Sequence, residues 1–309
     1  MIVFLLGSTG VGKSEVALRL AEEEGGAILS LDSMQVYRGL DVGTGKATAA
    51  ERQRVPHGGL DLSPWREPID VARYAEAAAA FLRENGERPL YVVGGTGLYF
   101  RALTQGLSEA PPAPPELRAE LAALPLAELQ GRLRALDPGQ ADETGFAWEN
   151  PRRVQRALEV MTATGMPLRQ WQKERATLPV LAEGTYRAFL LLRERDDLRE
   201  RIADRVRAML DAGWDDEVRG LLAEGGPGSL AGCAAIGYDA LAEWIEAGSP
   251  AKTLPAVRQG IVDATRQYAK RQLTWFRRES KVESLMIAPF ESSEETSRRL
   301  REALRLPSC

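Results

Sequence analysis

The segment GSTGVGKS, from Gly7 to Ser14, constrains this chain more than any other stretch. It matches the pattern G-x-x-x-x-G-K-[S/T], follows the apolar run IVFLL (2–6), and precedes an amphipathic helical pattern from about Ser14 to Glu24. Strand, glycine loop and helix in this order form a phosphate-binding loop, or P-loop. Backbone N–H groups converge on phosphate oxygens, Lys13 neutralises charge, and the Ser14 hydroxyl can bind Mg²⁺. The predicted diphosphate-binding residues are Gly7, Ser8, Thr9, Gly10, Val11, Gly12, Lys13 and Ser14.

The P-loop alone does not identify the ligand. Its geometry recognises a diphosphate, and nothing in that geometry requires the diphosphate to belong to a nucleotide. A kinase, an NTPase and an enzyme whose leaving group is a non-nucleotide diphosphate would all use the same loop. Other residues must distinguish these functions.

Three further apolar runs predict a sheet. They are AILSL, PLYVVGG and AFLLL, at 27–31, 89–95 and 188–192, and an alanine-rich helical pattern occupies 69–85. Strands that are apolar throughout and alternate with helices are typical of a parallel sheet covered on both faces. The predicted fold is therefore α/β, with a P-loop-type parallel sheet and helices on both faces.

A proline-rich segment, APPAPPE at 110–116, interrupts this alternation and is expected to be a semi-rigid linker. From there to about Glu183 the patterns are helical, most clearly after Asn150-Pro151, a good cap and first-turn pair. We therefore expect an all-helical insertion in a sheet domain. The predicted divisions are 1–109 for the first part of the core, 110–184 for the insertion, and 185–309 for the second part with a basic helix at 254–278.

Composition excludes several classes of protein. The longest apolar runs fall short of the roughly 18 residues that a membrane span needs. No positively charged segment precedes the first apolar stretch, so a signal peptide is not expected. We therefore expect the protein to be cytoplasmic. Two cysteines, Cys233 and Cys309, cannot form a disulfide framework, and with one histidine, His57, a zinc site is not expected. Any metal should be bound by oxygen.

The charge distribution is uneven. The whole chain carries 40 basic and 44 acidic residues, a net charge of −4, whereas residues 258–281 hold seven basic and two acidic residues, a local charge of +5. Arg266, Lys270 and Arg277 fall on one stripe of the helix expected there, beside Leu273 and Trp275. Such a stripe is either a solvated charged face or a phosphate-binding surface, and its contrast with the acidic remainder favours phosphate.

Single residues at strand ends are candidate site residues. Asp32 follows the strand at 27–31, where it could bind Mg²⁺, act as a general base or cap a helix. Thr96 follows the strand at 89–95, in a turn that needs glycine. Arg205 borders an apolar helical stripe and either extends to solvent or faces a buried anion.

Several motifs occur together in a fixed order and resemble those of the bacterial tRNA dimethylallyltransferase family. Besides the P-loop they are LDSMQVYRGLDVGTGKAT (31–48), VPHGGLD (55–61), VVGGTGLYFRAL (92–103), NPRRVQRALEV (150–160), AAIGYDAL (234–241) and TRQYAKRQLTWFRR (265–278). The resemblance covers about Ile2 to Arg278. It implies dimethylallyl diphosphate as donor, Mg²⁺ as cofactor, and N6 of the adenosine immediately 3′ of the anticodon, tRNA position 37, as acceptor. It also implies a monomer whose helical insertion embraces the anticodon stem-loop.

The resemblance also implies a role for each matching residue. Asp32 is the general base for the N6 amine, Thr9, Lys13, Ser14 and Mg²⁺ hold the diphosphate, and Arg205 contacts it. The target base is expected to be flipped out of the loop stack. Residues expected to bind tRNA, including the C-terminal stripe, are Asp32, Ser33, Met34, Gln35, Thr96, Arg118, Arg152, Arg153, Val154, Gln155, Arg156, Arg266, Lys270 and Arg277, with the segment 234–239.

Three alternatives remain open from the sequence. A small-molecule kinase would also pair a P-loop with a strand-end Asp, but it leaves the helical insertion and the basic helix unexplained. Prenyl transfer to free adenine nucleotides would use a similar core. A non-catalytic RNA-binding module that uses diphosphate as a switch would tolerate replacement of Asp32.

Overall fold

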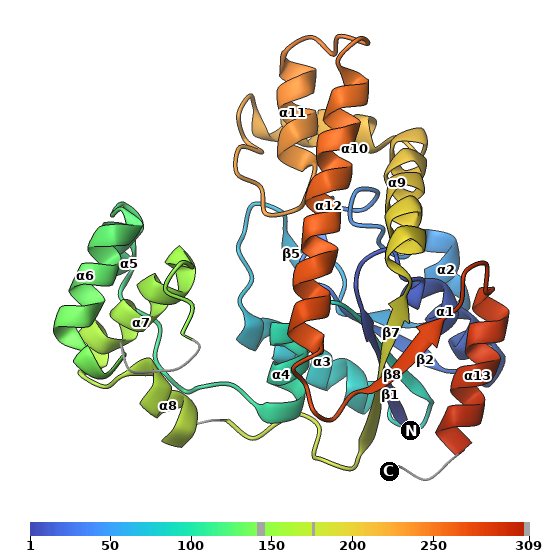
Figure 1. Cartoon of the computed structure of the whole chain (residues 1–309), viewed down its shortest axis with the longest axis horizontal. Coiled ribbons are helices and arrows are strands. Elements are labelled where there is room, and N and C mark those ends of the chain that lie inside the picture. Colours follow the sequence, from blue (N-terminus) through green and yellow to red (C-terminus); the bar gives the residue numbers. More distant parts are fainter. Residues whose placement is uncertain (141–145, 175–176, 306–309) are drawn as a thin grey trace. The chain divides into compact units, whose positions relative to one another are not determined.

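The chain divides into two compact units in a computed structural model that describes residues 1–140, 146–174 and 177–305 (Figure 1). Unit 1 comprises Met1–Thr104 and Val180–Cys309, and unit 2 comprises Gln105–Pro179. These divisions lie slightly earlier in the chain than the predicted boundaries at 110 and 184. Cys309 lies outside the described residues. Within the described residues, no helix is long and apolar enough to cross a membrane.

Unit 1 is built on a six-stranded sheet in the order β4-β2-β6-β1-β7-β8, in which every neighbouring pair is parallel. The four apolar runs form its centre, and their side chains are buried, which confirms the predicted parallel sheet. The strands are β1 (Ile2–Gly7), β2 (Ala27–Leu31), β4 (His57–Gly58), β6 (Leu90–Gly94), β7 (Tyr186–Arg193) and β8 (Glu283–Ile287).

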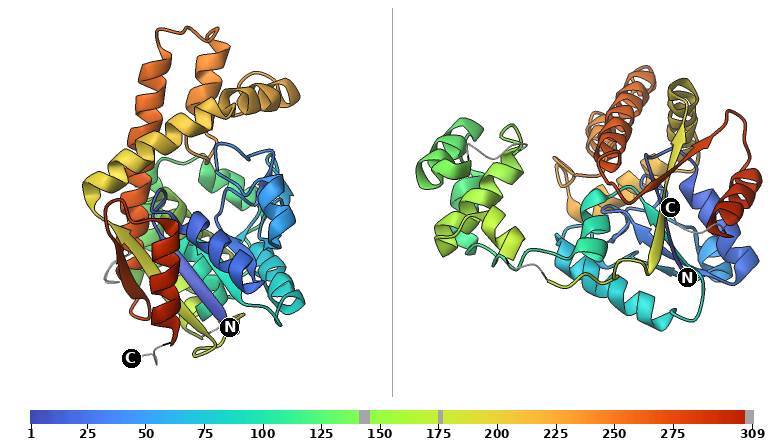
Figure 2. Two further views of the ribbon diagram at one scale, coloured as in Figure 1. Left: turned by 90° about the vertical axis from the view of Figure 1, so that its right-hand side faces the viewer. Right: turned by 60° about the horizontal axis from the view of Figure 1, so that its bottom comes forward.

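Helices cover both faces of this sheet, as predicted. One face packs on α3 (Val71–Glu84), α4 (Gly97–Gln105) and the C-terminal end of α12 (Leu254–Phe276). The other packs on α1 (Lys13–Glu24) and α13 (Ser293–Arg305), which lie side by side (Figure 2). β8 and α13 come from the tail, where the sequence pattern predicts no element. The strand ESLMI is largely exposed at the sheet edge, so it lacks a continuous apolar run.

A third apolar cluster lies at the carboxyl end of the sheet. It joins α9 (Arg195–Asp211), α10 (Trp214–Gly225), α11 (Tyr238–Glu246) and the upper part of α12 around the buried Trp214 ring. Between β2 and α3 the chain forms two short strands, β3 (Tyr37–Arg38) and β5 (Ser63–Pro64), and the helix α2 (Ala49–Arg54). We call the segment Leu40–Lys46 in this stretch the 40–46 loop.

Unit 2 is helical throughout its described residues, which confirms the predicted helical insertion. Its helices are α5 (Pro115–Ala122), α6 (Leu126–Leu136), a 3₁₀ turn (Pro138–Gln140), α7 (Pro151–Thr164) and α8 (Leu168–Glu174). The Asn150 side chain accepts the N–H of Arg153, so it caps α7 as its sequence predicts. Leu121, Leu129, Leu133 and Leu158 form the core.

The proline-rich segment, predicted to be a semi-rigid linker, is fastened to the helices of unit 2. Ala110 and Ala113 are buried, and the Arg156 guanidinium donates to the carbonyls of Ala110 (2.9 Å) and Pro111 (3.2 Å). Proline leaves carbonyl groups without neighbouring N–H donors, so a side-chain donor from α7 can fasten the segment. The first and last segments of unit 2 also meet, because the N–H of Thr177 donates to Leu107 O.

Candidate active site

The carboxyl ends of three adjacent strands meet at one pocket. β6 lies between β1 and β2, and Gly94 is in register with Leu6 on one side and Leu31 on the other. The next residues of the three strands therefore emerge together, as ligand-binding residues do in open parallel sheets. They border a cavity of about 460 Å³ lined by Thr9, Gly10, Gly12, Lys13, Ser14, Glu15, Asp32, Gln35, Thr44, Val93, Gly94, Gly95, Arg201, Asp204, Arg205, Ala208 and Gln272.

The P-loop has the geometry of an anion site. Gly12 adopts φ +103°, a conformation that glycine accepts readily, and α1 begins at the next residue. The N–H groups at the start of α1 have no intrahelical acceptor and lie at the positive end of the helix dipole. This structure places Gly10, Gly12, Lys13 and Ser14 in the cavity wall, where an anionic ligand can reach them.

Three cations hold the carbonyl groups of the P-loop. Lys13 Nζ donates to Gly7 O (3.0 Å) and Ser8 O (2.7 Å). Two arginines of β7 and α9 bind the opposite side of the loop: Arg193 Nε donates to Val11 O and Arg201 Nε to Gly10 O, both at 3.0 Å. The carbonyls of Gly7, Ser8, Gly10 and Val11 are thus engaged by side chains, which fixes this part of the loop backbone. Neither Arg193 nor Arg201 is among the predicted site residues.

Lys13 lies in an environment that disfavours its charge. Burial and the nearby Arg205 guanidinium lower the Lys13 pKa to about 7, while Asp32 acts in the opposite direction. Burial also lowers the pKa of Arg205, against the attraction of Asp32 and Glu15. Lys13 and Arg205 line the same polar cavity, so a bound anion would stabilise the charged form of both.

Asp32 borders two cavities. Its Oδ1 accepts the N–H groups of Met34 (2.8 Å) and Gln35 (3.4 Å), so one carboxylate oxygen fastens the turn that follows β2. Thr96 Oγ1 accepts the N–H of Ser33 (3.1 Å) and fixes the same turn to the end of β6. The carboxylate therefore helps to hold its own turn while it faces the ligand site.

The second cavity, of about 220 Å³, is bordered by more apolar groups. Thr9, Asp32, Thr44 and Arg205 line both cavities. The remaining wall of the second cavity consists of Ser33, Met34, Gly43, Val206, Met209, Trp214, Ala234, Ala235, Ile236, Thr265, Tyr268 and Arg271. Asp32 and Arg205 thus lie where a polar cavity rich in phosphate-binding groups adjoins one suited to an apolar group.

A buried glutamine of α12 connects two loops of the site. Gln272 Oε1 accepts the N–H of Thr9 (2.8 Å), and its Nε2 donates to Gly95 O (3.1 Å). Gln272 is not among the predicted site residues. A signal was nevertheless present, because Gln272 shares the buried face of α12 with Ile261, Ala269 and Phe276, where a polar side chain needs a partner.

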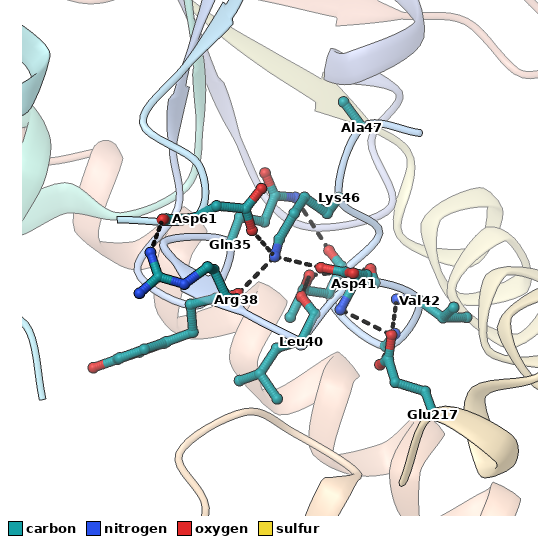
Figure 3. A network of polar contacts seen from close by, with 12 residues as sticks. Gln35, Arg38, Leu40, Asp41, Val42, Lys46, Ala47, Asp61 and Glu217 are labelled. Carbon is teal, nitrogen blue, oxygen red and sulfur yellow. Dashed lines mark hydrogen bonds and ion pairs between the residues drawn. The ribbon is translucent and has the colours of Figure 1, made fainter. Parts of the chain in front are cut away.

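The 40–46 loop is held from two sides (Figure 3). Lys46, whose side chain is fully buried, donates through Nζ to Tyr37 O (2.6 Å), Asp41 Oδ1 (2.5 Å) and Asp61 Oδ1 (2.8 Å). Burial acts to raise the Asp61 pKa, but hydrogen bonds from Lys46 and Arg52 outweigh it and lower that pKa. On the opposite side, the Glu217 carboxylate accepts the N–H groups of residues 41–43.

The residues predicted to bind tRNA do not form one set. Ser33, Met34, Gln35 and Thr96 lie in the turns beside the cavities. On α12, Lys270 and Arg277 are exposed, whereas Arg266 pairs with Asp263 (3.2 Å). The basic residue of this helix that borders the second cavity is Arg271, outside the predicted stripe.

The predicted contacts in unit 2 include one error. Val154 is fully buried in the unit 2 core because it lies on the apolar face of α7, so its side chain cannot face RNA. Arg156 lies 3.6 Å from Glu159 and Arg118 lies 4.0 Å from it, and Gln155 also donates to Glu159. Arg152 and Arg153 are exposed.

Comparison with known proteins identifies the family. The family model described as IPP transferase matches residues 35–279, and the one described as isopentenyl transferase matches residues 1–58. The tRNA dimethylallyltransferase of Methylacidiphilum infernorum is 39% identical over 283 residues, which cover 90% of this chain and 83% of that protein. This chain belongs to the tRNA dimethylallyltransferase family. The resemblance seen in the sequence motifs is thereby confirmed.

Other members of the tRNA dimethylallyltransferase family match over similar lengths. The Halorhodospira halophila enzyme is 44% identical over 291 residues, covering 89% of both chains. A solved structure, the full-length tRNA isopentenylpyrophosphate transferase of Bacillus halodurans, is 32% identical with a TM-score of 0.66, covering 98% of this chain and 95% of that one. A eukaryotic dimethylallyltransferase acting on tRNA, 24% identical with a TM-score of 0.79, shares the fold and covers 98% and 77%.

The described residues offer few protein ligands for a metal. No group of three or more His, Cys, Asp or Glu side chains in the described ranges could hold a metal ion. The cavity does contain the Ser14 hydroxyl beside the P-loop. A site of this composition fits Mg²⁺, which keeps several waters and commonly binds through one or two side chains together with phosphate oxygens.

Proposed function

We propose that this chain transfers a dimethylallyl group from dimethylallyl diphosphate to N6 of the adenosine immediately 3′ of the anticodon, tRNA position 37. The observation that carries this proposal is the position of Asp32 and Arg205, which border both the polar cavity and the more apolar one. The diphosphate would occupy the polar cavity, and the prenyl group would extend into the apolar one. The acceptor amine would then lie near Asp32.

The reaction needs one bond to form and one to break. The N6 nitrogen attacks C1 of the prenyl group, the C1–O bond breaks, and diphosphate leaves with the bonding electrons. Asp32 takes the proton that the amine loses, a general-base contribution of about 10²- to 10⁴-fold. Lys13, Arg205 and the N–H groups of the P-loop stabilise the charge that develops on the leaving group. Thr9 lines both cavities and would contact the donor where diphosphate and prenyl group join.

Mg²⁺ would bind to Ser14 and to diphosphate oxygens. When bound, it would neutralise part of the charge of the leaving group. Because the cavity also holds Lys13, Arg201 and Arg205, the protein itself supplies positive charge on the remaining sides. The chain would act as a monomer in the cytoplasm, where its RNA substrate is found.

RNA recognition would use the rim of the apolar cavity and the exposed cations of α12. Tyr268, Arg271 and Thr265 line that cavity, while Lys270 and Arg277 are exposed on the same helix. The target base would have to leave the loop stack to reach Asp32. Arg152 and Arg153, exposed at the start of α7, would contact phosphates of the RNA.

A direct test incubates the protein with dimethylallyl diphosphate, Mg²⁺ and an anticodon stem-loop, followed by mass spectrometry of the RNA. We expect the mass of one dimethylallyl group on a stem-loop with adenosine at the target position. The matched control carries guanosine there and should remain unmodified. Prenylation of AMP but not of the stem-loop, or ATP turnover without prenyl transfer, would contradict the proposal.

A further inference from the structure

The 40–46 loop forms part of the wall of both cavities. Thr44 lines both of them, and Gly43 lines the apolar one. The loop also supports Arg205, whose Nη2 lies 3.4 Å from Thr44 O and is so close to Gly45 that a Cβ there would lie 2.1 Å from it. The position of the Arg205 guanidinium therefore depends on the backbone of this loop.

Glu217 of α10 holds that backbone by three hydrogen bonds. Its Oε2 accepts the N–H groups of Asp41 (2.9 Å) and Val42 (2.7 Å), and its Oε1 accepts that of Gly43 (3.3 Å) (Figure 3). Successive N–H groups that point to one centre form an anion-binding nest. Here the anion is a side chain of the protein itself. Glu217 lies 174 to 176 positions after the three residues whose N–H groups it accepts.

The Glu217 carboxylate is itself fixed by its neighbours. Tyr238 OH donates to Oε1 at 2.5 Å. One turn earlier on α10, the buried Trp214 ring packs so closely on Gly43 that a Cβ at Gly43 would lie 2.0 Å from its Nε1. Residues three apart share a helix face, so α10 presents both a carboxylate and an aromatic ring to the same loop.

The 40–46 loop is also held from the turn that follows β2. Gln35 donates through Nε2 to Thr44 O (3.2 Å) and Gly45 O (3.1 Å), and its Oε1 accepts from Ser30 Oγ (2.8 Å). Gln35 thus fixes the carbonyls at one end of the loop and Glu217 fixes the N–H groups at the other end. Arg205 packs against Thr44 and Gly45, the residues that Gln35 holds and that directly follow those held by Glu217.

We propose that Glu217 is a positioning residue for the diphosphate donor: by fixing the N–H groups of residues 41–43, it holds the 40–46 loop and, through it, Arg205. This inference rests on the proposed function for its kinetic test, but not for its binding test. Glu217 does not line either cavity, so it acts through the loop and not on the ligand.

Two variants of Glu217 test the proposal in a graded way. Glu217→Ala removes all acceptors, and we expect it to raise the KM for dimethylallyl diphosphate and the Kd for inorganic pyrophosphate about tenfold, the usual scale for losing charge-assisted bonds. Glu217→Gln keeps one acceptor for Asp41 and Val42, so about a threefold rise is expected. Pyrophosphate binding is measured by calorimetry at a temperature where circular dichroism shows each variant folded.

A matched control lies on the same helix. Glu224 is exposed, and its carboxylate accepts a long hydrogen bond from Trp65 Nε1 (3.5 Å), so Glu224→Gln should leave the KM and the Kd unchanged. The KM for the stem-loop should stay within twofold of wild type in all variants. If Glu217→Ala does not fold, the Glu217→Gln result decides the question.

Two outcomes would overturn the inference. One is a pyrophosphate Kd that stays at the wild-type value in the folded Glu217 variants. The other is an equal loss of kcat/KM for donor and stem-loop, which indicates general damage and not donor positioning. If the wild-type protein binds pyrophosphate but transfers no prenyl group, the proposed function fails, and the pyrophosphate comparison still decides the role of Glu217.

Discussion

The P-loop and the 40–46 loop line the same cavity, and each brings several backbone N–H groups to one point. In the P-loop, Lys13, Arg193 and Arg201 bind the carbonyl groups and leave the N–H groups at the start of α1 facing the cavity. In the 40–46 loop the N–H groups are already bound to the Glu217 carboxylate.

This difference suits the P-loop to binding a ligand and the 40–46 loop to supporting a neighbouring side chain. A nest whose carbonyls are fixed and whose N–H groups face a cavity is prepared for an external anion. A nest filled by a carboxylate of the protein binds nothing further, but it becomes a rigid surface for a neighbouring side chain, here Arg205. Preorganised donors of this kind need no rearrangement when charge develops on the leaving group.

The largest expected effect is the loss of kcat on replacing Asp32, which lies between the two loops in the sequence. Asp32→Asn should lower kcat for prenyl transfer by about 10²- to 10⁴-fold, because the amide cannot accept the proton. The affinity for the stem-loop should remain close to that of wild type, measured by filter binding or fluorescence anisotropy. The amide oxygen can still accept the N–H of Met34, so the turn is kept. Near-wild-type transfer by this variant would exclude Asp32 as the base.

The close packing of Gly43 on Trp214 should be the next most sensitive feature. Gly43→Ala places a Cβ 2.0 Å from Trp214 Nε1, and we expect it to lower the free energy of unfolding by about 1–3 kcal/mol. Urea denaturation measures this change. Gly220→Ala on α10 is the control: apart from its chain neighbours and the nearby backbone of its own helix, no described atom lies within 4 Å of its Cβ position, so the helix should gain about 0.5–1 kcal/mol. Equal stability of both variants would contradict the described packing.

The affinity for pyrophosphate should depend on pH through Lys13 of the P-loop. Burial and Arg205 lower the Lys13 pKa to about 7, so in the free protein Lys13 is charged below pH 7 and loses its proton as the pH rises through 7. If the charged form of Lys13 is the one that binds diphosphate, as proposed, the affinity for pyrophosphate should fall above pH 7, by up to about tenfold per pH unit. Calorimetry between pH 6 and 8.5 measures this.

The control for this titration is Lys13→Met, whose profile contains only the ionisation of the ligand and of other groups. The difference between the two profiles isolates Lys13. If wild type and Lys13→Met show the same pH dependence, the lysine does not titrate in this range.

The smallest effect is expected for the exposed cations of α12. Lys270→Ala should weaken stem-loop binding only a few-fold and reduce the slope of log K against log salt by about 1, as for the loss of one phosphate contact. Donor KM should not change. Lys252→Ala, an exposed lysine that precedes α12, serves as the matched control. An unchanged salt slope for Lys270→Ala would show that Lys270 does not contact an RNA phosphate.

The sequence predicts the parts of the site that depend on local patterns. The P-loop, Asp32 and Thr96 follow apolar runs directly, and the order of strands in a parallel sheet places them at one edge. The helical insertion is predicted for the same reason, because the cap at Asn150 and the periodic apolar residues of α7 are local signals.

The supporting residues could not be predicted in this way. Gln272 is 263 positions from its partner Thr9, and Arg193 is 182 positions from Val11. Glu217 has the same surroundings in the sequence as any charged residue near a helix N-terminus. No periodicity specifies such pairs, since they depend on which helix the folded chain brings against which loop. Val154 shows the converse error, where a family motif was read as a contact although helical spacing places it in the core.

The Gln272–Thr9 hydrogen bond has a consequence for how the protein is made. During synthesis the first ten residues leave the ribosome long before α12 exists, and β1 gains its second neighbour, β7, only after unit 2 has been translated. Until then the nascent chain presents an unpaired apolar strand edge, a site where chaperones bind and aggregation starts. The oldest segment of the chain is therefore completed by one of the youngest.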